Sequence, residues 1–410
     1  MITSMVLRKE IEMDIDYGTT TNTSVFQSSV ISSSTQKSSL LQRIENKVVI
    51  HNRWSSSRIK PDMVAILIPA YNEKAMIGET IQSLRKQSIS TDVDLVVWVI
   101  ANNCKDNTAD IARHYGAHVI EMPDNPFMKA GALNKGIQEL LDYQEIPEFI
   151  ITIDADTILD QFFVDRCISV MRLHPEIGVL GAVCRGIPNL GKTLPQKMLL
   201  WLQQAEYAKA GEVRMRQNIH TAPGAGSFFR MKAILDVLRD RPTLYKEHKL
   251  NLVEDFEATL EIKKRGWKVT NNFHCIAHTD LMPTIRGLFN QRIRWVRGTI
   301  DELRRRGWHK ETRASIAVIA LGMISIPLFY LWWAIAVWGF TSGREHLLSF
   351  AMLPLMSIYQ AITLRKLGWK SSLVGALLVP DIIFAMMRHT WIVISLVKSY
   401  VGRPQKWSNS

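Results

Sequence analysis

The chain has 410 residues, of which 47% are hydrophobic, and carries a formal net charge of +12. This length allows one large domain or two ordinary ones. The charge raises the question of nucleic acid, but no nucleic-acid module and no interleaving of basic and aromatic residues occurs. The basic residues gather beside long apolar runs, so no nucleic acid is expected as a partner. The four cysteines lack metal-binding spacing and are expected to be packing thiols.

Residues 1–60 are rich in Ser and Thr and contain no long apolar run. They show the features of neither a signal peptide nor a membrane anchor. A polar segment of this kind cannot bury enough apolar surface to form a core. We therefore expect a largely disordered leader.

Strand and helix patterns alternate from Val64 onwards. Short apolar runs are typical of buried strands, and apolar residues three or four apart are typical of helices. Strands are predicted over 64–69, 95–100, 117–122 and 149–153, and helices over 74–86, about 106–116 and 130–141. This alternation predicts a doubly wound α/β domain with a largely parallel sheet.

The fourth predicted strand ends in two carboxylates one residue apart, Asp154 and Asp156. Open α/β sheets bind ligands beyond the carboxyl ends of their strands. Hard oxygen ligands at that place suit Mg²⁺ or Mn²⁺ shared with substrate phosphates, although such carboxylates can also simply cap a turn. Neither a dinucleotide glycine fingerprint nor a phosphate-binding loop follows the first strand. A metal is therefore the expected means of handling phosphates.

Three apolar segments follow the globular part. Residues 314–340 and 346–364 contain no Asp, Glu, Lys or Arg, whereas 371–397 carries Pro380, Asp381 and Arg388. Uncharged segments of this length predict membrane-spanning helices, and the basic clusters beside them favour the cytoplasm. The third segment has two alternatives, a tilted crossing or a re-entrant segment that returns the tail to the cytoplasm.

Seven motifs occur in the order that one enzyme family uses. They are Pro69–Glu73 (PAYNE), Ala101–Ala109 (ANNCKDNTA), Lys129–Asn134 (KAGALN), Asp154–Asp156 (DAD), Gly224–Arg230 (GAGSFFR), Val253–Asp255 (VED) and Gln291–Trp295 (QRIRW). Over about residues 62–310 the chain resembles the inverting membrane glycosyltransferases of family 2. That family has the GT-A fold and includes cellulose, chitin, hyaluronan and poly-N-acetylglucosamine synthases.

The resemblance implies a domain organisation. It consists of an α/β GT-A domain over 61–282, amphipathic interface helices over 283–312, two to three membrane segments over 313–400 and a basic tail over 401–410. It also implies an integral membrane protein with a cytoplasmic catalytic domain, in a bacterial-type plasma membrane. The implied partners are a nucleotide-sugar donor, with a UDP-sugar favoured, a saccharide or lipid-linked acceptor, and the lipid bilayer. Because so few spans would not enclose a polysaccharide channel, polymer export would need either partner chains or self-assembly into a homo-oligomer.

The same resemblance assigns roles to single residues. Asp156 is the direct metal ligand, and Asp154 lies beside it on the nucleotide side. The residues expected to bind the nucleotide-sugar are Tyr71, Glu73, Asn102, Asp106, Lys129 and Asp154. Relatives usually have an acidic residue at the position of Asn102, so the base contact and the donor nucleotide stay open. For Asp106 the alternative is a helix cap.

Asp255 is the expected general base. With Glu254 it would open a helix, whose dipole would lower the pKa of Asp255; the alternative is that both acids only stabilise the helix start. Acceptor and diphosphate contacts are expected from Gln291, Arg294, Trp295 and Glu254. Arg294 can bind a diphosphate bidentately, and Trp295 offers a flat face to an acceptor sugar. The alternative for this stretch is an interfacial helix with basic and aromatic belts.

The predicted function is inverting, metal-dependent transfer of a sugar from a nucleotide-sugar to an acceptor hydroxyl at the cytoplasmic membrane face, in the manner of a polysaccharide synthase. Two alternatives stay open. One is addition of a single sugar to a lipid carrier or other membrane-associated acceptor. The other is a non-catalytic membrane scaffold, against which the complete set of motif carboxylates argues.

Overall fold

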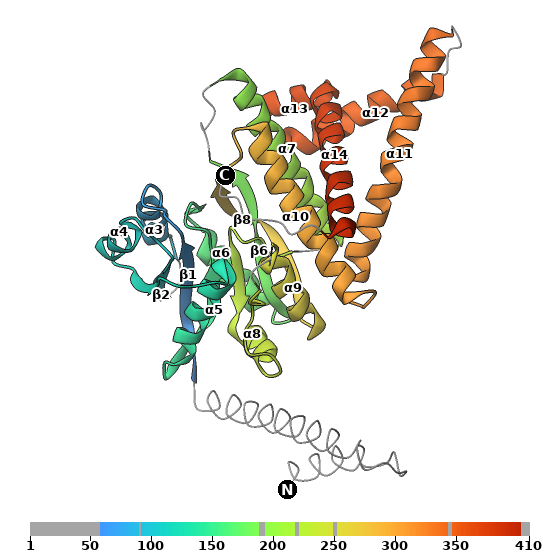
Figure 1. The fold of residues 1–410 in the computed structure, drawn as a ribbon. Coiled ribbons are helices and arrows are strands. Elements are labelled where there is room, and N and C mark those ends of the chain that lie inside the picture. Colours follow the sequence, from blue (N-terminus) through green and yellow to red (C-terminus); the bar gives the residue numbers. More distant parts are fainter. Residues whose placement is uncertain are drawn as a thin grey trace, which may run out of the picture. The chain divides into compact units, whose positions relative to one another are not determined.

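The computed structural model describes residues 58–89, 92–187, 193–217, 221–248, 252–342 and 347–402 (Figure 1). The chain divides into two units, Met1–Ser56 and Ser57–Ser410, and every described element belongs to the second. The predicted leader therefore lies outside the described residues except for its last three. These three residues belong to the first described strand.

The first half of the sheet consists of parallel strands, as predicted. The elements are β1 (Arg58–Ala70), α3 (Ile77–Arg85), β2 (Asp94–Asn102), α4 (Thr108–His114), β3 (His118–Met122), α5 (Met128–Leu141) and β4 (Glu145–Thr152). β1 lies between β2 and β4, with Leu67 level with Trp98 on one side and Thr152 on the other. These strands all end at the same edge of the sheet, which brings their following loops together.

The second half of the sheet is mixed. It contains β5 (Ile158–Leu159), α6 (Phe163–Leu173), β6 (Ile177–Gly186), α7 (Leu194–Gln217), β7 (Ser227–Arg230), α8 (Met231–Leu238), α9 (Glu254–Lys264) and β8 (Lys268–Thr279). The strand order is β3-β2-β1-β4-β7-β6-β8-β5. β7 is antiparallel to β4 and β6, whereas β6 and β8 are parallel. The predicted mostly parallel mixed sheet is confirmed.

Helices cover both faces of the sheet. On one face, α3 and α6 pack against alternate residues of β1 and β4, such as Ile66 and Ile151. On the other face, α5 approaches so closely that a Cβ at Gly136 would come within 3.1 Å of Leu67 and Ile100. Burial on both faces explains why the strands are continuous apolar runs instead of alternating ones.

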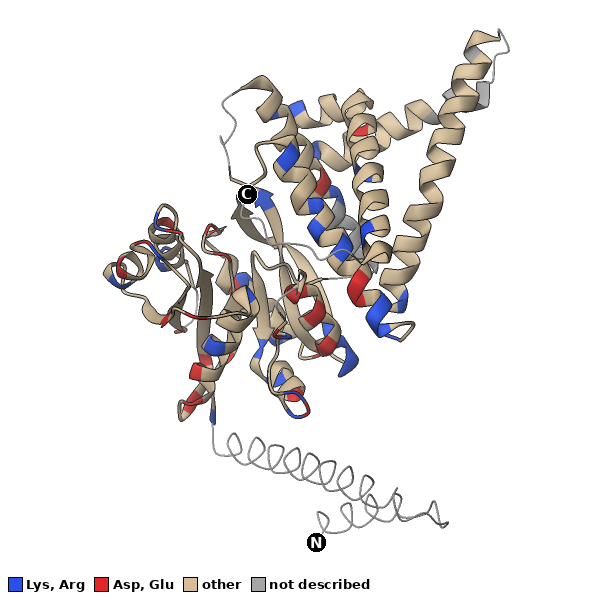
Figure 2. Cartoon of the chain, viewed as in Figure 1, with Lys and Arg blue, Asp and Glu red and all other residues tan. Residues whose placement is uncertain are grey.

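The chain after β8 is helical. It forms α10 (Ile285–Arg306), α11 (Arg313–Thr341), α12 (Leu347–Leu364), a 3-10 turn (Arg365–Leu367), α13 (Trp369–Ala376) and α14 (Val379–Val401). Among the described residues, two helical segments are long and apolar enough to cross a membrane, Arg313–Gly339 and Val379–Val401. α12 has 18 residues and no charged residue, and Leu353–Leu364 within it is a further, shorter apolar segment. Figure 2 shows Lys and Arg along α10 and at its junction with α11, which has no charged residue beyond Arg313.

The third predicted apolar segment, 371–397, is not one helix. α13 ends at Ala376, Leu378 has a positive φ of 59°, and α14 starts at Val379 with Pro380 in its first turn. The predicted break at Pro380–Asp381 thus lies slightly earlier, because proline is well tolerated in the first turn of a helix. Asp381 is paired with Lys209 of α7 and accepts a hydrogen bond from the Gln360 amide at 2.8 Å.

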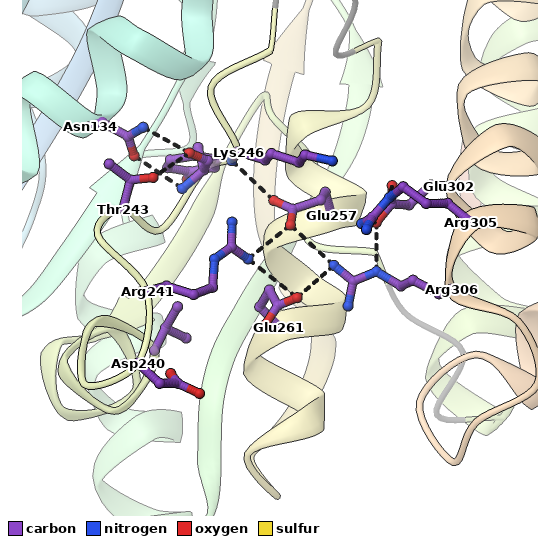
Figure 3. Close-up of polar contacts among 12 residues, drawn as sticks. Asn134, Asp240, Arg241, Thr243, Lys246, Glu257, Glu261, Glu302, Arg305 and Arg306 are labelled. Atoms are coloured by element: carbon purple, nitrogen blue, oxygen red, sulfur yellow. Dashed lines mark hydrogen bonds and ion pairs between the residues drawn. The ribbon is translucent and has the colours of Figure 1, made fainter. Parts of the chain in front are cut away.

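A buried cluster of charges joins α9 to α10 (Figure 3). Glu257 accepts from Arg241 at 2.8 Å and from Arg306 at 3.1 Å, and Arg306 also contacts Glu261 at 2.7 Å. The side chains of Glu257 and Arg306 are only 3% and 8% exposed. Buried charges are tolerated only when they are paired. Arg306, at the end of α10, therefore holds α9 in place.

Replacing Arg306 by Ala should destabilise the protein, because Glu257 and Glu261 then lose a partner in a buried place. The free energy of unfolding should fall by about 3 kcal/mol, which is the lower end of the range for breaking a buried ion pair. The loss is not larger because Arg241 still pairs with both glutamates. Arg305→Ala is the matched control: this side chain is 47% exposed and bonds Glu302, so its loss should stay below about 1 kcal/mol. Unfolding of both variants in detergent measures the difference, and equal losses would contradict the role of Arg306.

Candidate active site

A cavity of about 980 Å³ lies beyond the carboxyl ends of β1, β2 and β4 and extends to α10. All seven motifs contribute to its wall. The lining residues include Tyr71, Glu73, Asn102, Lys129, Asp154, Asp156, Gly224, Glu254, Asp255, Gln291, Arg294 and Trp295. Of the predicted site residues, Asp106 is the one that does not line this cavity. Residues far apart in the sequence thus meet in one place.

The turn after β4 carries Asp154 and Asp156. Thr80 fixes it from behind by donating from Oγ1 to the Ala155 carbonyl at 2.7 Å, and the Thr157 amide donates to the Asp154 carbonyl at 3.1 Å. Both threonines are fully buried. The backbone of the turn is therefore held by the core, while its two carboxylates belong to the cavity wall.

Asp156 combines burial with a missing partner. Its Oδ1 atom is buried and has no hydrogen-bond partner among the described residues. Burial, and then the charges of Asp154, Glu73 and Asp280, raise the pKa of Asp156 to about 7. A carboxylate crowded by other carboxylates is stabilised by an ion of opposite charge. A divalent cation therefore fits this site.

The protein would supply only part of the ligand set of that cation. In the described part of the chain, no three His, Cys, Asp or Glu side chains are grouped closely enough to hold a metal ion. Mg²⁺ commonly binds through one or two carboxylates together with waters and substrate phosphates. The donor set at Asp156 thus suits a cation that binds together with a diphosphate.

Lys129, in the first turn of α5, is enclosed by carboxylates. Its Nζ pairs with Asp154 and lies 3.6 Å from Glu254. Burial alone favours the neutral amine, but the charges of Asp154 and Glu254 outweigh it and raise the pKa of Lys129. A Cβ at Gly224 would come within 2.6 Å of Nζ. A side chain at position 224 would therefore displace this ammonium group.

Asp255 lies in the first turn of α9. Its Oδ1 accepts from the Phe256 amide at 2.7 Å and its Oδ2 from the Gly224 amide at 3.3 Å. The predicted lowering of its pKa is wrong: burial, and then the charge of Glu254, raise the pKa of Asp255 to about 6. The helix dipole is outweighed, and the pKa lies near the range in which a general base is most effective.

Tyr71, Glu73 and Asn102 lie where β1 and β2 end. Tyr71 is 39% exposed, whereas burial, and then the charges of Asp154 and Asp280, raise the pKa of Glu73. Asn102 is buried, and its Oδ1 accepts from Asn125 Nδ2 at 2.7 Å. The Asn125 side chain also donates to the Met128 carbonyl at 2.6 Å. Asn125, which the sequence did not single out, thus ties the end of β2 to the start of α5.

Asp106 has the contacts of a structural residue. Its Oδ1 accepts from the Thr108 amide at 3.1 Å, at the start of α4, and its Oδ2 accepts from the Lys74 amide at 3.3 Å. These bonds join the loops that follow β1 and β2. They are the contacts expected from the capping alternative.

α10 carries the last motif past the start of α9. Thr284 caps this helix by accepting from the Gly287 amide at 3.1 Å. Further along, a Cβ at Gly298 would come within 2.8 Å of Val253, two residues before Asp255. The cavity residues of this helix include Gln291, Arg294 and Trp295. The glycine thus lets α10 lie directly against the segment that positions Asp255.

Asp280, Tyr207 and Lys398 are among the cavity-lining residues that were not predicted. Asp280 follows β8 immediately, so it repeats the pattern of a carboxylate at a strand end and could have been found by it. Tyr207 lies inside α7 and Lys398 inside α14, where no sequence pattern distinguishes them. Lys398 shows that a helix apolar enough to cross a membrane also reaches the cavity.

Known proteins are similar to a large part of this chain. Poly-beta-1,6-N-acetyl-D-glucosamine synthase of Staphylococcus epidermidis is 25% identical over 288 residues, which are 65% of this chain and 63% of that protein. The same enzyme of Staphylococcus aureus (strain COL) is 24% identical over 269 residues, 62% and 60% of the two chains. This chain thus matches less than two thirds of the length of these curated relatives.

Among solved structures, a mannosyltransferase from Pyrobaculum calidifontis in complex with GDP-Man and Mn²⁺ has the same fold. It superposes with a TM-score of 0.54 at 15% identity, over 88% of this chain and 96% of that one. The family model described as glycosyltransferase like family 2 matches residues 61–298. The chain therefore belongs to glycosyltransferase family 2.

Proposed function

We propose that the chain is an inverting, metal-dependent glycosyltransferase that moves a sugar from a nucleotide-sugar onto an acceptor hydroxyl at the cytoplasmic face of a membrane. The observation that carries this proposal is the buried carboxylate oxygen of Asp156, which has no hydrogen-bond partner among the described residues and lies in the same cavity as Asp255. The first suits a cation on a diphosphate, and the second suits a base for an acceptor. Membership of the family supports sugar transfer.

Different residues of the cavity serve different parts of a direct displacement at the donor sugar. A bound divalent cation supplies Lewis acidity toward the diphosphate leaving group. Lys129, kept charged by Asp154 and Glu254, places a positive charge beside the carboxylate turn. Arg294 can bind diphosphate oxygens bidentately. Asp255 accepts the proton of the acceptor hydroxyl. The hydroxyl oxygen attacks the anomeric carbon of the donor sugar as the nucleotide diphosphate leaves, and the configuration of that carbon is inverted.

The proposed donor is a UDP-sugar. The relatives are synthases of a poly-N-acetylglucosamine, so UDP-N-acetylglucosamine is the first donor to test. GDP-mannose is the second, because a mannosyltransferase of the same fold binds GDP-Man. A panel of labelled donors, assayed with the detergent-solubilised protein with and without Mn²⁺, tests the function directly. If no donor gives either transfer or hydrolysis, the proposed function is wrong.

Asp156→Ala should abolish nearly all metal-dependent transfer. The variant removes a carboxylate from a site shared by cation and diphosphate, at a cost of several kcal/mol of transition-state stabilisation. It should also lose Mn²⁺-dependent binding of UDP, which can be measured without turnover. Asp160→Asn is the control, because this nearby carboxylate pairs with Arg166 at 2.7 Å. Wild-type activity that survives EDTA would contradict the metal site.

Asp255→Asn should fold, bind donor and fail in transfer. Loss of a positioned general base typically lowers the rate about 10²–10⁴-fold. The pKa of Asp255 is raised to about 6 from its ordinary 3.8, so its ionised form is disfavoured in the folded protein and a neutral amide is no electrostatic burden. Glu254→Gln is the comparison. Wild-type turnover by Asp255→Asn would move the role of the base to Glu254.

The same carboxyl gives a pH dependence. Asp255 must be ionised to accept a proton, and burial raises its pKa to about 6. The rate of transfer should therefore rise as pH increases through about 6 and fall below it. A profile of kcat between about pH 5 and 8 measures this, and a rate independent of pH across that range would contradict it.

A second candidate is addition of one sugar to a membrane-bound lipid acceptor. The observation that favours it is Lys398, which brings α14, a candidate membrane span, to the cavity wall. A lipid phosphate could reach such a lysine from the bilayer. The size of the labelled product separates the two candidates, because a polymer grows with time whereas single addition stops.

We propose that α11 and α12 carry the chain across the membrane and back, and that α14 lies at the membrane surface. α14 packs along the basic helix α10, where Ser395 donates to the Ile293 carbonyl at 3.3 Å and Arg304 donates to the Ser399 carbonyl at 2.9 Å. A helix with so many arginines as α10 does not enter hydrocarbon. A cysteine at Ser408, outside the described residues, should then be labelled from the cytoplasmic side of sealed vesicles, with the unaltered chain as control. Labelling from the external side alone would contradict this topology.

A further inference from the structure

The motif that contains Lys129 ends in a residue that does not line the cavity. Asn134 lies in α5, five positions after Lys129, and is 7% exposed. It is not one of the described residues that form the cavity wall. A polar side chain buried in this way costs free energy unless it is hydrogen-bonded. The partners of Asn134 therefore indicate its role.

Asn134 is hydrogen-bonded to segment 241–248, which leads from α8 toward α9 (Figure 3). Its Oδ1 accepts from the Tyr245 amide at 3.0 Å, and its Nδ2 donates to the Tyr245 carbonyl at 2.8 Å and to Glu247 Oε1 at 3.0 Å. Because a backbone N–H only donates and a carbonyl only accepts, these bonds fix the orientation of the Asn134 amide.

Segment 241–248 is also fixed to α9. The Lys246 amide donates to Glu257 Oε2 at 3.1 Å, and Arg241 pairs with Glu257 Oε1 at 2.8 Å. Glu257 lies three residues after Glu254 in α9, as Asn134 lies five residues after Lys129 in α5. The segment therefore bridges α5 and α9 about one helical turn away from the cavity.

The same two helices are bridged a second time inside the cavity, where Lys129 Nζ lies 3.6 Å from Glu254. A lysine side chain is long and flexible, so this bridge does not by itself fix the separation and tilt of α5 and α9. The bridge through Asn134 ends on backbone groups and on the buried Glu257, which leaves less freedom. Together the two bridges form a closed ring around the start of both helices.

We propose that Asn134 is a positioning residue for sugar transfer, which holds α9, and with it Asp255, at a fixed place relative to Lys129. Asn134 does not touch the substrate in this role. A general base must lie within hydrogen-bond reach of the acceptor hydroxyl, and a misplacement of about 1 Å can lower a rate about 100-fold. This inference rests on the proposed function of Asp255 as that base.

Asn134→Ala should lower kcat roughly 10- to 100-fold, because α9 is then held to α5 by the flexible lysine bridge alone. Binding of UDP with Mn²⁺ should change by less than about twofold, because Asp156 lies on the turn after β4, which the core holds through Thr80. Asn134→Ser, a milder variant that keeps a hydroxyl for one hydrogen bond, should fall between Asn134→Ala and the wild-type protein in kcat.

Gln87→Ala is the matched control. The Gln87 amide also makes three bonds to backbone groups: Nε2 donates to the carbonyls of Ser83 at 3.3 Å and Asp160 at 2.9 Å, and Oε1 accepts from the Val164 amide at 3.1 Å. Gln87 lies just after α3 and is not one of the described residues of the cavity wall. This variant should lose stability as Asn134→Ala does, yet keep kcat within about twofold of the wild-type value. If kcat falls in both variants in proportion to lost stability, the role of Asn134 is merely structural and the proposal is wrong.

A pair of variants tests the bonds themselves. Asn134→Asp keeps an acceptor for the Tyr245 amide but places a carboxylate against the Tyr245 carbonyl and Glu247, so kcat should fall. Adding Glu247→Gln supplies an amide donor to that carboxylate and should recover part of kcat, whereas Glu247→Gln alone should have little effect. Absence of any recovery in the double variant would contradict the proposed bridge, because residues that contact one another are expected to be coupled.

A distance measurement tests the positioning role without turnover. Nitroxide labels are placed at Gln138→Cys in α5 and Lys264→Cys in α9, both exposed positions, and the unsubstituted chain is labelled in parallel to account for the native cysteines. In the detergent-solubilised protein, Asn134→Ala should broaden or lengthen the distribution of distances between the labels, and Gln87→Ala should leave it unchanged. An unaltered distribution in Asn134→Ala would overturn the proposal even if sugar transfer is found. A broadened one in a protein that transfers no sugar would retain the bridge between α5 and α9 and refute the proposed function.

Discussion

One partly buried ammonium group, that of Lys129, links the two sides of the cavity. Lys129 lies between Asp154, where β4 ends, and Glu254, where α9 begins. Without this charge, the carboxylates of the sheet edge and of the helix start would repel one another. The approach of α9 to the sheet, and with it the position of Asp255, depends on this pairing.

Lys129 does not balance all the acids that face the cavity. Asp156 and Asp255 both have raised pKa values, and each owes its shift first to burial and next to a neighbouring carboxylate. Such a site favours whatever brings positive charge into it. A diphosphate that binds together with a divalent cation adds little net negative charge to the carboxylates of the cavity. Donor and metal are therefore expected to bind as partners, each improving the site for the other.

Local patterns in the sequence predicted the parts of the site that lie at the ends of regular elements. Asp154 and Asp156 were found because an apolar run stops at them, and the start of α9 was found because Glu254 and Asp255 precede a helical pattern. Tyr207 and Lys398 could not be found in this way, because they reach the cavity only through the packing of helices that are distant from the other motifs in the chain. The pKa of Asp255 was misjudged for the same reason: the helix dipole is local, whereas the burial that outweighs it is a property of the folded cavity.

Acid should affect the activity and the stability of the protein at different pH values, because the charge cluster between α9 and α10 resists protonation. Hydrogen bonds and charges from Arg265, Arg241 and Arg306 outweigh burial and lower the pKa of Glu261 to about 2, from an ordinary 4.5. A carboxyl with a depressed pKa stabilises the fold above its unfolded value and loses that contribution only as pH falls toward its folded one. The Asp255 carboxyl, in contrast, is already protonated below about pH 6. Mild acid should thus stop transfer while the ion pairs between α9 and α10 remain intact. Activity lost in mild acid should therefore return on neutralisation, because the protein has not unfolded.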